Sequence, residues 1–306
     1  MRLGVLDVGS NTVHLLVVDA HQGAHPWPAH SQKERLRLAE QLKPDGSLSE
    51  EGANALVSAC AAAKEAAGRL EVDELMAFAT SAVRDASNSA EVLRRVWLET
   101  GVDLRVLSGE DEARMTFLAV RRWFGWSAGR LLVLDIGGGS LEIAAGVDES
   151  PDVAISLPLG AGRLTRARVK NDPPQPDELA ALESYVDSKL EHKELDKIGG
   201  WDLAAATSKT FRSLARLAGA APSAEGLWAP RGLSITGLSQ VRGFIQRMPS
   251  TALAELDGVS FSRAHQLVAG AVVAQRTMNR LGIEELRVCP WALREGVILS
   301  RLDQLT

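Results

Sequence analysis

A pattern of apolar runs broken by small polar turns occurs twice along the chain. In the first copy, Gly4–Asn11 (GVLDVGSN) ends an apolar run with Asp, one apolar residue and Gly, and Val13–Val18 forms a second apolar run. In the second copy, Leu132–Gly139 (LVLDIGGG) is followed by Leu141–Val147, a run that Glu142 interrupts. Apolar runs joined by small, Gly-rich turns are typical of β-hairpins. The repeat therefore predicts two related domains built by duplication.

Helical periodicity and capping signals predict the elements that lie between and after the hairpins. Leu56, Cys60 and Ala63 fall at helical spacing in an Ala-rich stretch, and Asn88 with Glu91 resembles a capping box. Because strands and helices are mixed along the chain, the fold class is α/β. The predicted helices are 49–69, 88–97, 110–124, 177–190, 210–217, 238–247, 261–281 and one that begins at Trp291, and the predicted strands are 75–80, 104–107 and 202–206.

Length and composition then narrow the class of protein. A chain of 306 residues favours two domains, each large enough to bury a core. We place them at residues 1–125 and 126–306, with Trp126–Gly129 as the linker. A hydrophobic content of 45% with 24% charged residues is typical of a globular protein. The net charge of −5 argues against nucleic acid and anionic membranes as partners, so an anionic substrate needs a local basic patch.

The cysteines, histidines and N-terminus give no sign of a disulfide, a metal cluster or a membrane anchor. Cys60 and Cys289 lie in no CxxC or His-rich setting, and we expect both to be reduced core thiols. The segment His21–His30 holds three histidines and two prolines, which favours a solvent-exposed loop over a metal site. No signal peptide is apparent, and no apolar run approaches the ~20 residues that span a bilayer. A cytoplasmic location is the expectation.

The second Gly-rich turn has the composition of a phosphate-binding site. Gly137, Gly138, Gly139 and Ser140 follow the strand that ends near Asp135. Glycines let the backbone approach a ligand closely, and successive N–H groups in such a turn can bind phosphate oxygens. Asp135 and Glu142 flank the turn, and paired carboxylates beside phosphates are a usual way to hold Mg²⁺. A tight hairpin with two solvated carboxylates is the alternative.

The first turn repeats this layout with different side chains. Gly9, Ser10 and Asn11 offer backbone N–H groups together with hydroxyl and amide donors, and Asp7 stands where Asp135 stands in the second copy. An ordinary polar hairpin turn is the alternative. Neither copy matches the Walker A pattern or the dinucleotide fingerprint GxGxxG. A nucleotide or polyphosphate must therefore be held by another architecture.

Six ordered motifs make the chain resemble a known family. Paired strand–Asp–Gly hairpins look like the superfamily of actin, sugar kinases and heat-shock-chaperone ATPases. Within it, the chain resembles the exopolyphosphatase / guanosine pentaphosphate phosphatase family in a short two-domain form. The motifs span nearly the whole chain in the family's order. They are Gly4–Asn11 (GVLDVGSN), Thr80–Ala86 (TSAVRDA), Ser108–Arg114 (SGEDEAR), Asp135–Glu142 (DIGGGSLE), Leu157–Thr165 (LPLGAGRLT) and Leu293–Val297 (LREGV).

The resemblance implies a role for each motif. Glu112 matches the catalytic Glu that orients or deprotonates the attacking water. Asp135 and Glu142, with Asp7 in the first copy, match acidic residues that position Mg²⁺, and Arg84 matches an Arg that meets phosphate. Gly9–Asn11 and Gly137–Ser140 match the two phosphate-binding turns. From the residues alone, Glu112 is a surface helix residue and Arg84 an ion-pair partner of Asp85 or Glu91.

Two stretches depart from the family pattern. Lys209 stands where the family usually carries a glycine, in a turn that lies against adenine and ribose in related ATPases. A cation there impedes base packing and suits a passing polyanion, with Arg212 one helical step away; an exposed Lys at a helix N-terminus is the alternative. The stretch Arg163–Lys170 holds four cations in eight residues. It is either a track for a phosphate chain or a solvated helix face.

The implied architecture is two duplicated actin-like (ribonuclease H-like) domains with a cleft between them, and the terminal helix, residues 291–305, is expected to pack on the first domain. The implied activity is release of orthophosphate from the end of inorganic polyphosphate, of short to medium length because extra C-terminal domains of longer relatives are missing here. Guanosine pentaphosphate hydrolysis, a sugar or carboxylate kinase, and a non-catalytic sensor of polyphosphate or of an alarmone (guanosine pentaphosphate or tetraphosphate) are the alternatives. Mg²⁺ is the expected cofactor, with K⁺ as a further candidate, and a homodimer is expected from the family.

Overall fold

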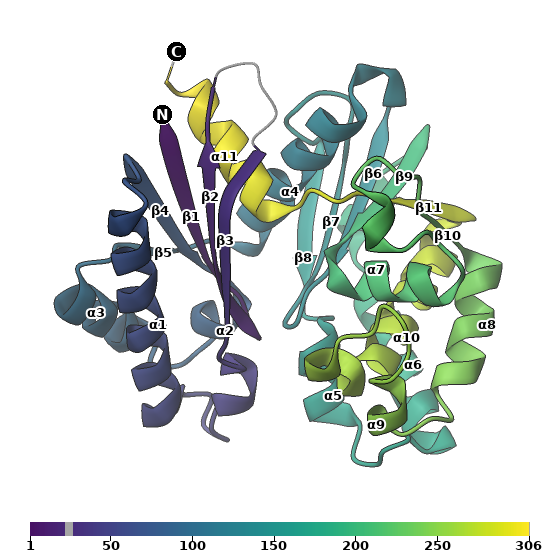
Figure 1. Ribbon diagram of the computed structural model, residues 1–306. Coiled ribbons are helices and arrows are strands. Elements are labelled where there is room, and N and C mark those ends of the chain that lie inside the picture. The colour runs from purple at the N-terminus through teal and green to yellow at the C-terminus, as the bar shows by residue number, and fades with distance from the viewer. Residues whose placement is uncertain (22–26, 306) are drawn as a thin grey trace. The chain divides into compact units, whose positions relative to one another are not determined.

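The computed structural model describes residues 1–21 and 27–305 and divides them into two compact units. Unit 1 comprises Met1–Met115 with Leu293–Thr306, and unit 2 comprises Thr116–Ala292. Each unit is a mixed β-sheet with helices packed on it (Figure 1). The α/β class predicted from the sequence is confirmed. The duplicated domains predicted at 1–125 and 126–306 stay a prediction.

Unit 1 is built on a sheet of five strands in the order β3-β2-β1-β4-β5. The first three strands pair antiparallel as consecutive hairpins, and β1 also pairs parallel with β4, which pairs parallel with β5. The carboxyl end of β1 is therefore the point from which both the first hairpin turn and the loop after β4 depart. The strands are β1 (Arg2–Val8), β2 (Thr12–Asp19), β3 (Trp27–Arg35), β4 (Glu74–Ala79) and β5 (Leu104–Val106).

Both faces of this sheet are covered, which explains the continuous apolar runs of its strands. On one face Leu6 and Val8 pack in a core with residues of α1 (Glu50–Arg69) and α3 (Ser89–Thr100). On the other face Leu3 and Val5 pack with Ile298 of α11 (Leu293–Asp303). Alternate residues of one strand thus enter two separate cores. The 3-10 turn η1 (Leu38–Gln41), α2 (Ser81–Arg84) and the start of α4 (Gly109–Phe124) complete the unit.

The last helix, α11, is packed against the start of α4 within unit 1. A methyl group at Gly296 would lie 1.8 Å from the carbonyl oxygen of Met115, so only a glycine allows this approach. Arg301 adds an ion pair with Glu74 of β4 at 2.9 Å. The LREGV motif therefore packs against α4, the helix that carries Glu112.

Unit 2 repeats the topology of unit 1 on a larger sheet. Its order, β10-β11-β9-β6-β7-β8, contains an antiparallel meander β6-β7-β8 and parallel pairs β6-β9 and β9-β11. The hairpin turns also match: Gly9 N–H donates to the Thr12 carbonyl at 3.0 Å, and Gly137 N–H donates to the Ser140 carbonyl at 2.9 Å. The strands are β6 (Leu131–Ile136), β7 (Leu141–Gly146), β8 (Val153–Leu157), β9 (Leu203–Thr207), β10 (Gly232–Ser234) and β11 (Glu285–Val288).

The core of unit 2 is centred on a buried helix. Every residue of Leu267–Ala274, the first part of α10 (Leu267–Leu281), is buried, so this helix is covered on all sides. It packs with Leu132, Leu134 and Ile136 of the central strand. The other elements are α5 (Ala161–Arg168), α6 (Pro176–Leu190), α7 (Ser208–Leu217), α8 (Ile235–Ile245), α9 (Ser250–Leu253) and the 3-10 turns η2 (Trp126–Ala128), η3 (Lys193–Lys197), η4 (Ser223–Glu225) and η5 (Phe261–Gln266).

The structure corrects three local predictions. The helix predicted at 261–281 is a 3-10 turn, η5, followed by α10. Asn88 forms no capping box; its side chain instead accepts from Leu48 N–H at 2.8 Å and donates to the Leu48 carbonyl at 3.1 Å. The loop predicted at His21–His30 becomes strand β3 from Trp27 onward, and residues 22–26 of that segment lie outside the described residues.

The cysteines are as predicted from the sequence. Cys60 and Cys289 are both free and buried, and burial raises the pKa of the Cys60 thiol to about 12. A thiol with so high a pKa stays protonated near neutral pH and is a poor nucleophile. Among the described residues, no helix has the length and apolar character needed to cross a membrane.

Arg121 is a buried cation that links the connection between α4 and β6 to the end of β7. Its side chain is 1% exposed, and its guanidinium donates to the carbonyls of Gly125, Gly129 and Gly146 at 3.2, 2.7 and 3.1 Å. The ring of Phe117 lies 5.8 Å from the guanidinium carbon. Burial lowers the pKa of Arg121.

We predict that Arg121→Ala lowers the free energy of unfolding by about 3–5 kcal/mol, because it leaves a cavity and three carbonyls without their donor. Chemical denaturation measures this loss. The control is Arg122→Ala, which removes an ion pair with the partly exposed Glu149 and costs about 1 kcal/mol or less. Equal losses for the two variants would contradict this role of Arg121.

Candidate active site

The first hairpin turn is held by hydrogen bonds on one side of its backbone. The carbonyl of Ser10 accepts from Ala39 N–H at 3.0 Å, and the carbonyl of Asn11 accepts from Arg37 N–H at 3.0 Å. In a trans peptide the N–H points away from the carbonyl, so the N–H group of Asn11 is directed to the opposite side of the turn. Ser10 and Asn11 are both buried. The turn thus has the orientation that an anion-binding backbone requires.

A pair of serine hydroxyls links this turn to the short helix that carries Arg84. The Oγ atoms of Ser10 and Ser81 lie 2.9 Å apart and are buried. Thr80 N–H donates to the Val8 carbonyl at 3.0 Å, which fixes the start of α2 beside the end of β1. The TSAVRDA motif therefore positions Arg84 relative to the Gly9–Asn11 turn within unit 1.

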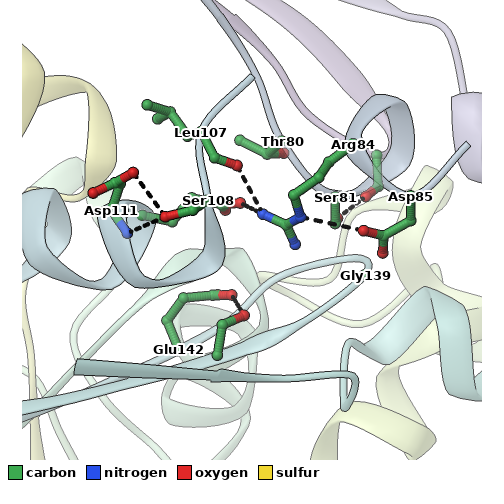
Figure 2. A network of polar contacts seen from close by, with 12 residues as sticks. Thr80, Ser81, Arg84, Asp85, Leu107, Ser108, Asp111, Gly139 and Glu142 are labelled. Atoms are coloured by element: carbon green, nitrogen blue, oxygen red, sulfur yellow. Dashed lines mark hydrogen bonds and ion pairs between the residues drawn. The ribbon is translucent and has the colours of Figure 1, made fainter. Parts of the chain in front are cut away.

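Arg84 lies at the centre of a polar network (Figure 2). Its guanidinium donates to the Leu107 carbonyl at 3.1 Å and to Asp85 at 3.2 Å, and it forms an ion pair with Glu112. Burial alone would lower the pKa of Arg84, but the carboxylates of Glu112 and Asp85 outweigh it and raise that pKa. The ion pair with Asp85 considered from the sequence is thus present, together with a second one to the candidate catalytic residue.

Glu112 lies in the first turn of α4, where the SGEDEAR motif forms a cap. Ser108 Oγ accepts from Asp111 N–H at 3.1 Å, and the Ser108 carbonyl accepts from Glu112 N–H at 3.0 Å. Carboxylates are stabilised near a helix N-terminus by the helix dipole. Glu112 is 8% exposed whereas its neighbours Glu110 and Asp111 are exposed. The surface position that its sequence context suggests is therefore wrong, and Glu112 differs physically from its neighbours.

Asp7 faces a cation on the terminal helix. Arg294 donates to Asp7 Oδ2 at 3.2 Å, so the LREGV motif supplies a positive charge beside the first hairpin. Across the hairpin, Asp7 pairs with His14, whose Nε2 lies 2.8 Å from the Ser31 hydroxyl. Burial, with the charges of Arg294 and Lys33, lowers the pKa of His14 to about 3. The imidazole is therefore neutral at physiological pH.

In unit 2 the turn Gly137–Ser140, called the GGGS turn below, is likewise held by hydrogen bonds to the carbonyls on one side of its backbone. The carbonyl of Gly137 accepts from Ala161 N–H at 3.0 Å, and the carbonyl of Gly138 accepts from Arg163 N–H at 2.8 Å. The side chain of Arg163 donates to the Gly139 carbonyl at 2.7 Å. All three glycine carbonyls are thus bound by the start of α5. The N–H groups that follow them are directed to the other side of the turn.

Gly160 and Arg163 position this turn, and the residue-by-residue predictions missed both. A methyl group at Gly160 would lie 2.2 Å from the carbonyl carbon of Gly139 and 2.3 Å from the amide nitrogen of Ser140. No side chain can fit there without displacing the turn. The signal was present in the LPLGAGRLT motif, whose glycine and arginine are the residues in contact. Arg163 was instead predicted as part of a basic track.

Asp135 and Glu142 form a cross-strand pair beside the turn. They lie directly opposite each other on β6 and β7, so both side chains project from the same face of the sheet. Glu142 is buried and accepts a hydrogen bond from the Ser156 hydroxyl of β8 at 2.8 Å. Ser156 is a third residue that sequence reasoning missed.

This pair fits a hard divalent cation. Mg²⁺ prefers oxygen ligands and is commonly held by one or two carboxylates, with water and substrate phosphates completing its shell. Within residues 1–21 and 27–305, no three His, Cys, Asp or Glu side chains gather closely enough to hold a metal by themselves. The donor set of unit 2 therefore suits an ion that is shared with a phosphate ligand rather than a closed structural site.

Lys209 lies in the first turn of α7, directly after β9. It is exposed, and that turn contains no acidic residue to offset a cation near the helix N-terminus. The next residue, Thr210, donates to the Ile136 carbonyl at 3.0 Å and so fixes α7 to the strand end that leads into the GGGS turn. The left-handed backbone conformation in this turn belongs to Ser208, with φ of 87°, the residue directly before Lys209.

The other predicted cations do not act as one patch. The guanidinium of Arg168 stacks over the ring of Tyr185 at 3.4 Å, whereas Arg163 binds the GGGS turn. Arg212 donates to the carbonyl of Ser208 in its own helix at 3.1 Å. Each of these side chains thus has a different contact of its own, and these contacts do not indicate a continuous basic track along the surface.

Each unit therefore brings a subset of the predicted residues together. In unit 1, Ser10, Arg84 and Glu112 are joined by the network around α2. In unit 2, Asp135 and Glu142 flank the turn that Arg163 holds. The catalytic and binding roles of all these residues stay predictions.

Comparison with known proteins agrees with the motifs. The family model of the Ppx/GppA phosphatase family matches residues 17–305. Exopolyphosphatase 1 of Mycobacterium tuberculosis is 58% identical over 305 residues, covering 99% of this chain and 89% of the relative. A crystal structure of an exopolyphosphatase from Cytophaga hutchinsonii gives a TM-score of 0.88 at 25% identity, covering 99% of this chain and 98% of that one. The Aquifex aeolicus family member gives a TM-score of 0.83 at 25% identity, covering 100% and 99%. The resemblance inferred from the six motifs is thus confirmed, and the chain belongs to the Ppx/GppA phosphatase family.

Proposed function

We propose that the protein is an exopolyphosphatase, which hydrolyses the terminal phosphoanhydride bond of inorganic polyphosphate and releases orthophosphate. The observation that supports this most strongly is the 58% identity over nearly the whole chain to a relative named exopolyphosphatase 1. The phosphate-type turns and buried carboxylates of the two units supply the groups that such a reaction needs.

Phosphate oxygens are bound in this proposal by backbone and guanidinium donors. The N–H groups of Asn11 in the first turn and of Gly138–Ser140 in the second turn point away from the bound carbonyls of their peptides, which directs these N–H groups toward an anion. Arg84 adds a guanidinium group, whose paired N–H donors match the spacing of two phosphate oxygens. Because Arg84 is paired with Glu112, a phosphate that enters competes with this carboxylate for the same guanidinium.

Glu112 is the residue that we assign to water activation. Its carboxylate accepts a proton from the attacking water while the water oxygen bonds to the terminal phosphorus and the bridging P–O bond breaks. The products are orthophosphate and a chain one unit shorter. The cap at Ser108 and the packing of α11 on α4 keep this carboxylate in place, as a positioned general base requires.

Asp135 and Glu142 are the residues that would hold Mg²⁺, which supplies neutralisation of phosphate charge when bound. Ser156 orients Glu142 through its hydroxyl, as outer-sphere partners of metal ligands do. Asp7 is the corresponding residue of the first copy, and its carboxylate is shared with Arg294. A supplementary K⁺ site rests on the family resemblance alone.

Bare polyphosphate is the proposed substrate, and guanosine pentaphosphate is the alternative within the family. Lys209 at the start of α7 favours a polyanion over a stacked base. A homodimer and a cytoplasmic location are further parts of the proposal that come from the family and from composition. Light scattering coupled to size exclusion measures the first of these.

We predict that Glu112→Gln lowers kcat for orthophosphate release by about 10²–10⁴-fold, because the amide cannot accept the proton. Release from short and long polyphosphate, guanosine pentaphosphate and ATP is measured with Mg²⁺ present. Glu110→Gln, an exposed neighbour on the same helix, is the matched control and keeps wild-type kcat. If orthophosphate is released mainly from guanosine pentaphosphate, this nucleotide replaces polyphosphate as the proposed substrate. If no substrate releases orthophosphate, the protein is not a hydrolase of these compounds, and the kinase and sensor alternatives remain.

We predict that Asp135→Asn weakens binding of Mg²⁺ or Mn²⁺ by more than about tenfold, because one of two charged ligands is lost. Calorimetric titration with the metal, in the presence of tripolyphosphate and with every protein carrying Glu112→Gln to prevent hydrolysis, measures this independently of turnover. Asp148→Asn, an exposed carboxylate of the same unit, is the control. We expect Asp7→Asn to weaken binding less than Asp135→Asn, since Asp7 is already paired with Arg294. Equal affinity of the Asp135→Asn variant and wild type would argue against this site.

We predict that Gly160→Ala lowers kcat/KM by at least about 10²-fold, because the new methyl group must displace the Gly139–Ser140 backbone. It should also cost about 1–3 kcal/mol of stability through overpacking. Gly243→Ala is the control in the same unit: a methyl group at that position would have nothing within 4 Å, and the variant is expected to leave kcat/KM unchanged. Wild-type kcat/KM in Gly160→Ala would show that the turn needs no such support.

A further inference from the structure

Three neighbouring strands of unit 1 place a row of polar side chains beside the first hairpin turn. Asp7 of β1 lies opposite His14 of β2, and His14 lies opposite Lys33 of β3. Residues directly opposite each other on antiparallel strands project from the same face of a sheet. Because side chains alternate along a strand, Asp7 shares its face with Leu3 and Val5, which pack with α11. The row therefore lies on the face that α11 covers.

Arg294 is the charged residue that α11 brings to this row. Its Nη1 donates to Asp7 Oδ2 at 3.2 Å, and the two side chains are 22% and 20% exposed. The helix start that carries Arg294 is fixed, because Gly296 lies against the Met115 carbonyl and Ile298 is buried in the core. The packing of the helix thus holds the guanidinium against the carboxylate.

The equivalent row of unit 2 has the opposite balance of charge. There Asp135 lies opposite Glu142, which lies opposite Ser156. That row presents two carboxylates, whereas Asp7 is accompanied by two cations and an imidazole. Mg²⁺ prefers several oxygen ligands. The first hairpin offers it one carboxylate that a guanidinium already binds, so the residues of this hairpin do not fit a Mg²⁺ site.

We propose that Arg294 is the permanent counter-ion of Asp7, which it neutralises in place of a divalent cation. Unit 1 then holds no metal ion at Asp7 and presents no uncompensated negative charge beside the Gly9–Asn11 turn. The inference rests on the proposed function, in which that turn binds phosphate. It gives the LREGV motif a second task besides its packing on α4. In the absence of this guanidinium, the Asp7 carboxylate would repel an incoming phosphate.

A double-mutant cycle tests the counter-ion role. Binding of tripolyphosphate without divalent ions is measured by calorimetry, with every protein carrying Glu112→Gln. Arg294→Gln is expected to weaken binding about tenfold, because the carboxylate that is left alone repels the anion. Adding Asp7→Asn to Arg294→Gln should recover most of this loss, since the repelling charge is removed. Arg294→Lys keeps the charge and should weaken binding by about threefold or less.

The matched control uses the other ion pair between α11 and the sheet of unit 1. Arg301, in the last turn of α11, binds Glu74 at 2.9 Å, with side chains 28% and 34% exposed. Neither Arg301→Gln nor its combination with Glu74→Gln should change the affinity for tripolyphosphate. Three outcomes would overturn the proposal: the same loss in Arg301→Gln, no loss in Arg294→Gln, or no recovery when Asp7→Asn is added. A packing defect at Arg294 would persist in that double variant, whereas a charge defect would not.

The number of bound metal ions tests the replacement of a divalent cation by Arg294. His14→Glu combined with Arg294→Gln gives unit 1 two carboxylates, as in unit 2, and Ser31 Oγ already lies 2.8 Å from the side chain of residue 14. In an Asp135→Asn background, this protein is expected to gain one Mn²⁺ site, counted by electron paramagnetic resonance. His14→Glu with Arg294→Lys should gain none, because the ammonium remains beside the carboxylates. A gain in both folded proteins, or in neither, would contradict the replacement.

These measurements can fail separately from the proposed function. If the wild type releases no orthophosphate, the proposed function fails, but tripolyphosphate affinity and Mn²⁺ counts need no turnover and still decide the role of Arg294. If His14→Glu prevents folding, the binding cycle decides alone, because it leaves His14 in place.

Discussion

The candidate site depends on hydrogen bonds that reach the carbonyl oxygens of two hairpin turns from one side. The start of α5 binds all three glycine carbonyls of the GGGS turn, and residues after β3 bind those of Ser10 and Asn11. A trans peptide that directs its carbonyl inward must direct its N–H outward. The outward orientation of the N–H groups in each turn is therefore produced by residues that follow the turn in the chain. Gly160 is part of the same constraint, because a side chain there would occupy the space of the turn itself.

The hairpins of the two units share this pattern of backbone hydrogen bonds, but their side chains carry different charges. His14 and Glu142 occupy equivalent positions, each opposite the Asp of its hairpin. Each also contacts a serine hydroxyl on the third strand of its meander. Burial keeps His14 neutral at physiological pH, and Arg294 lies against Asp7. The first copy thus pairs one carboxylate with a cation, whereas the second presents two carboxylates. The two hairpins thus share their backbone geometry and differ in chemistry at single positions on the second strand.

Much of this architecture could be predicted from the sequence, since it follows from local patterns. The hairpins, the Ala-rich helix α1 and the fold class come from periodicity and turn composition. The positioning roles of Gly160, Arg163 and Ser156 could not be predicted from spacing, because they depend on which segment packs against a turn. The left-handed backbone of Ser208, with φ of 87°, was not predicted either, since serine rarely adopts this conformation. Glu112 needed the family resemblance, since only the fold distinguishes this buried carboxylate from Glu110 and Asp111.

The distribution of charge explains how a net acidic chain can contain sites for a polyanion. The arginines near the two turns are held in place one by one: Arg84 by Glu112 and Asp85, and Arg163 by the Gly139 carbonyl. Fixed guanidinium groups lose little conformational entropy when they bind phosphate. A broad basic surface would instead attract every polyanion, including nucleic acid, at long range. With a net charge of −5, recognition must come from short contacts that only a correctly placed phosphate can make. Discrimination among polyanions is therefore a matter of geometry rather than of total charge.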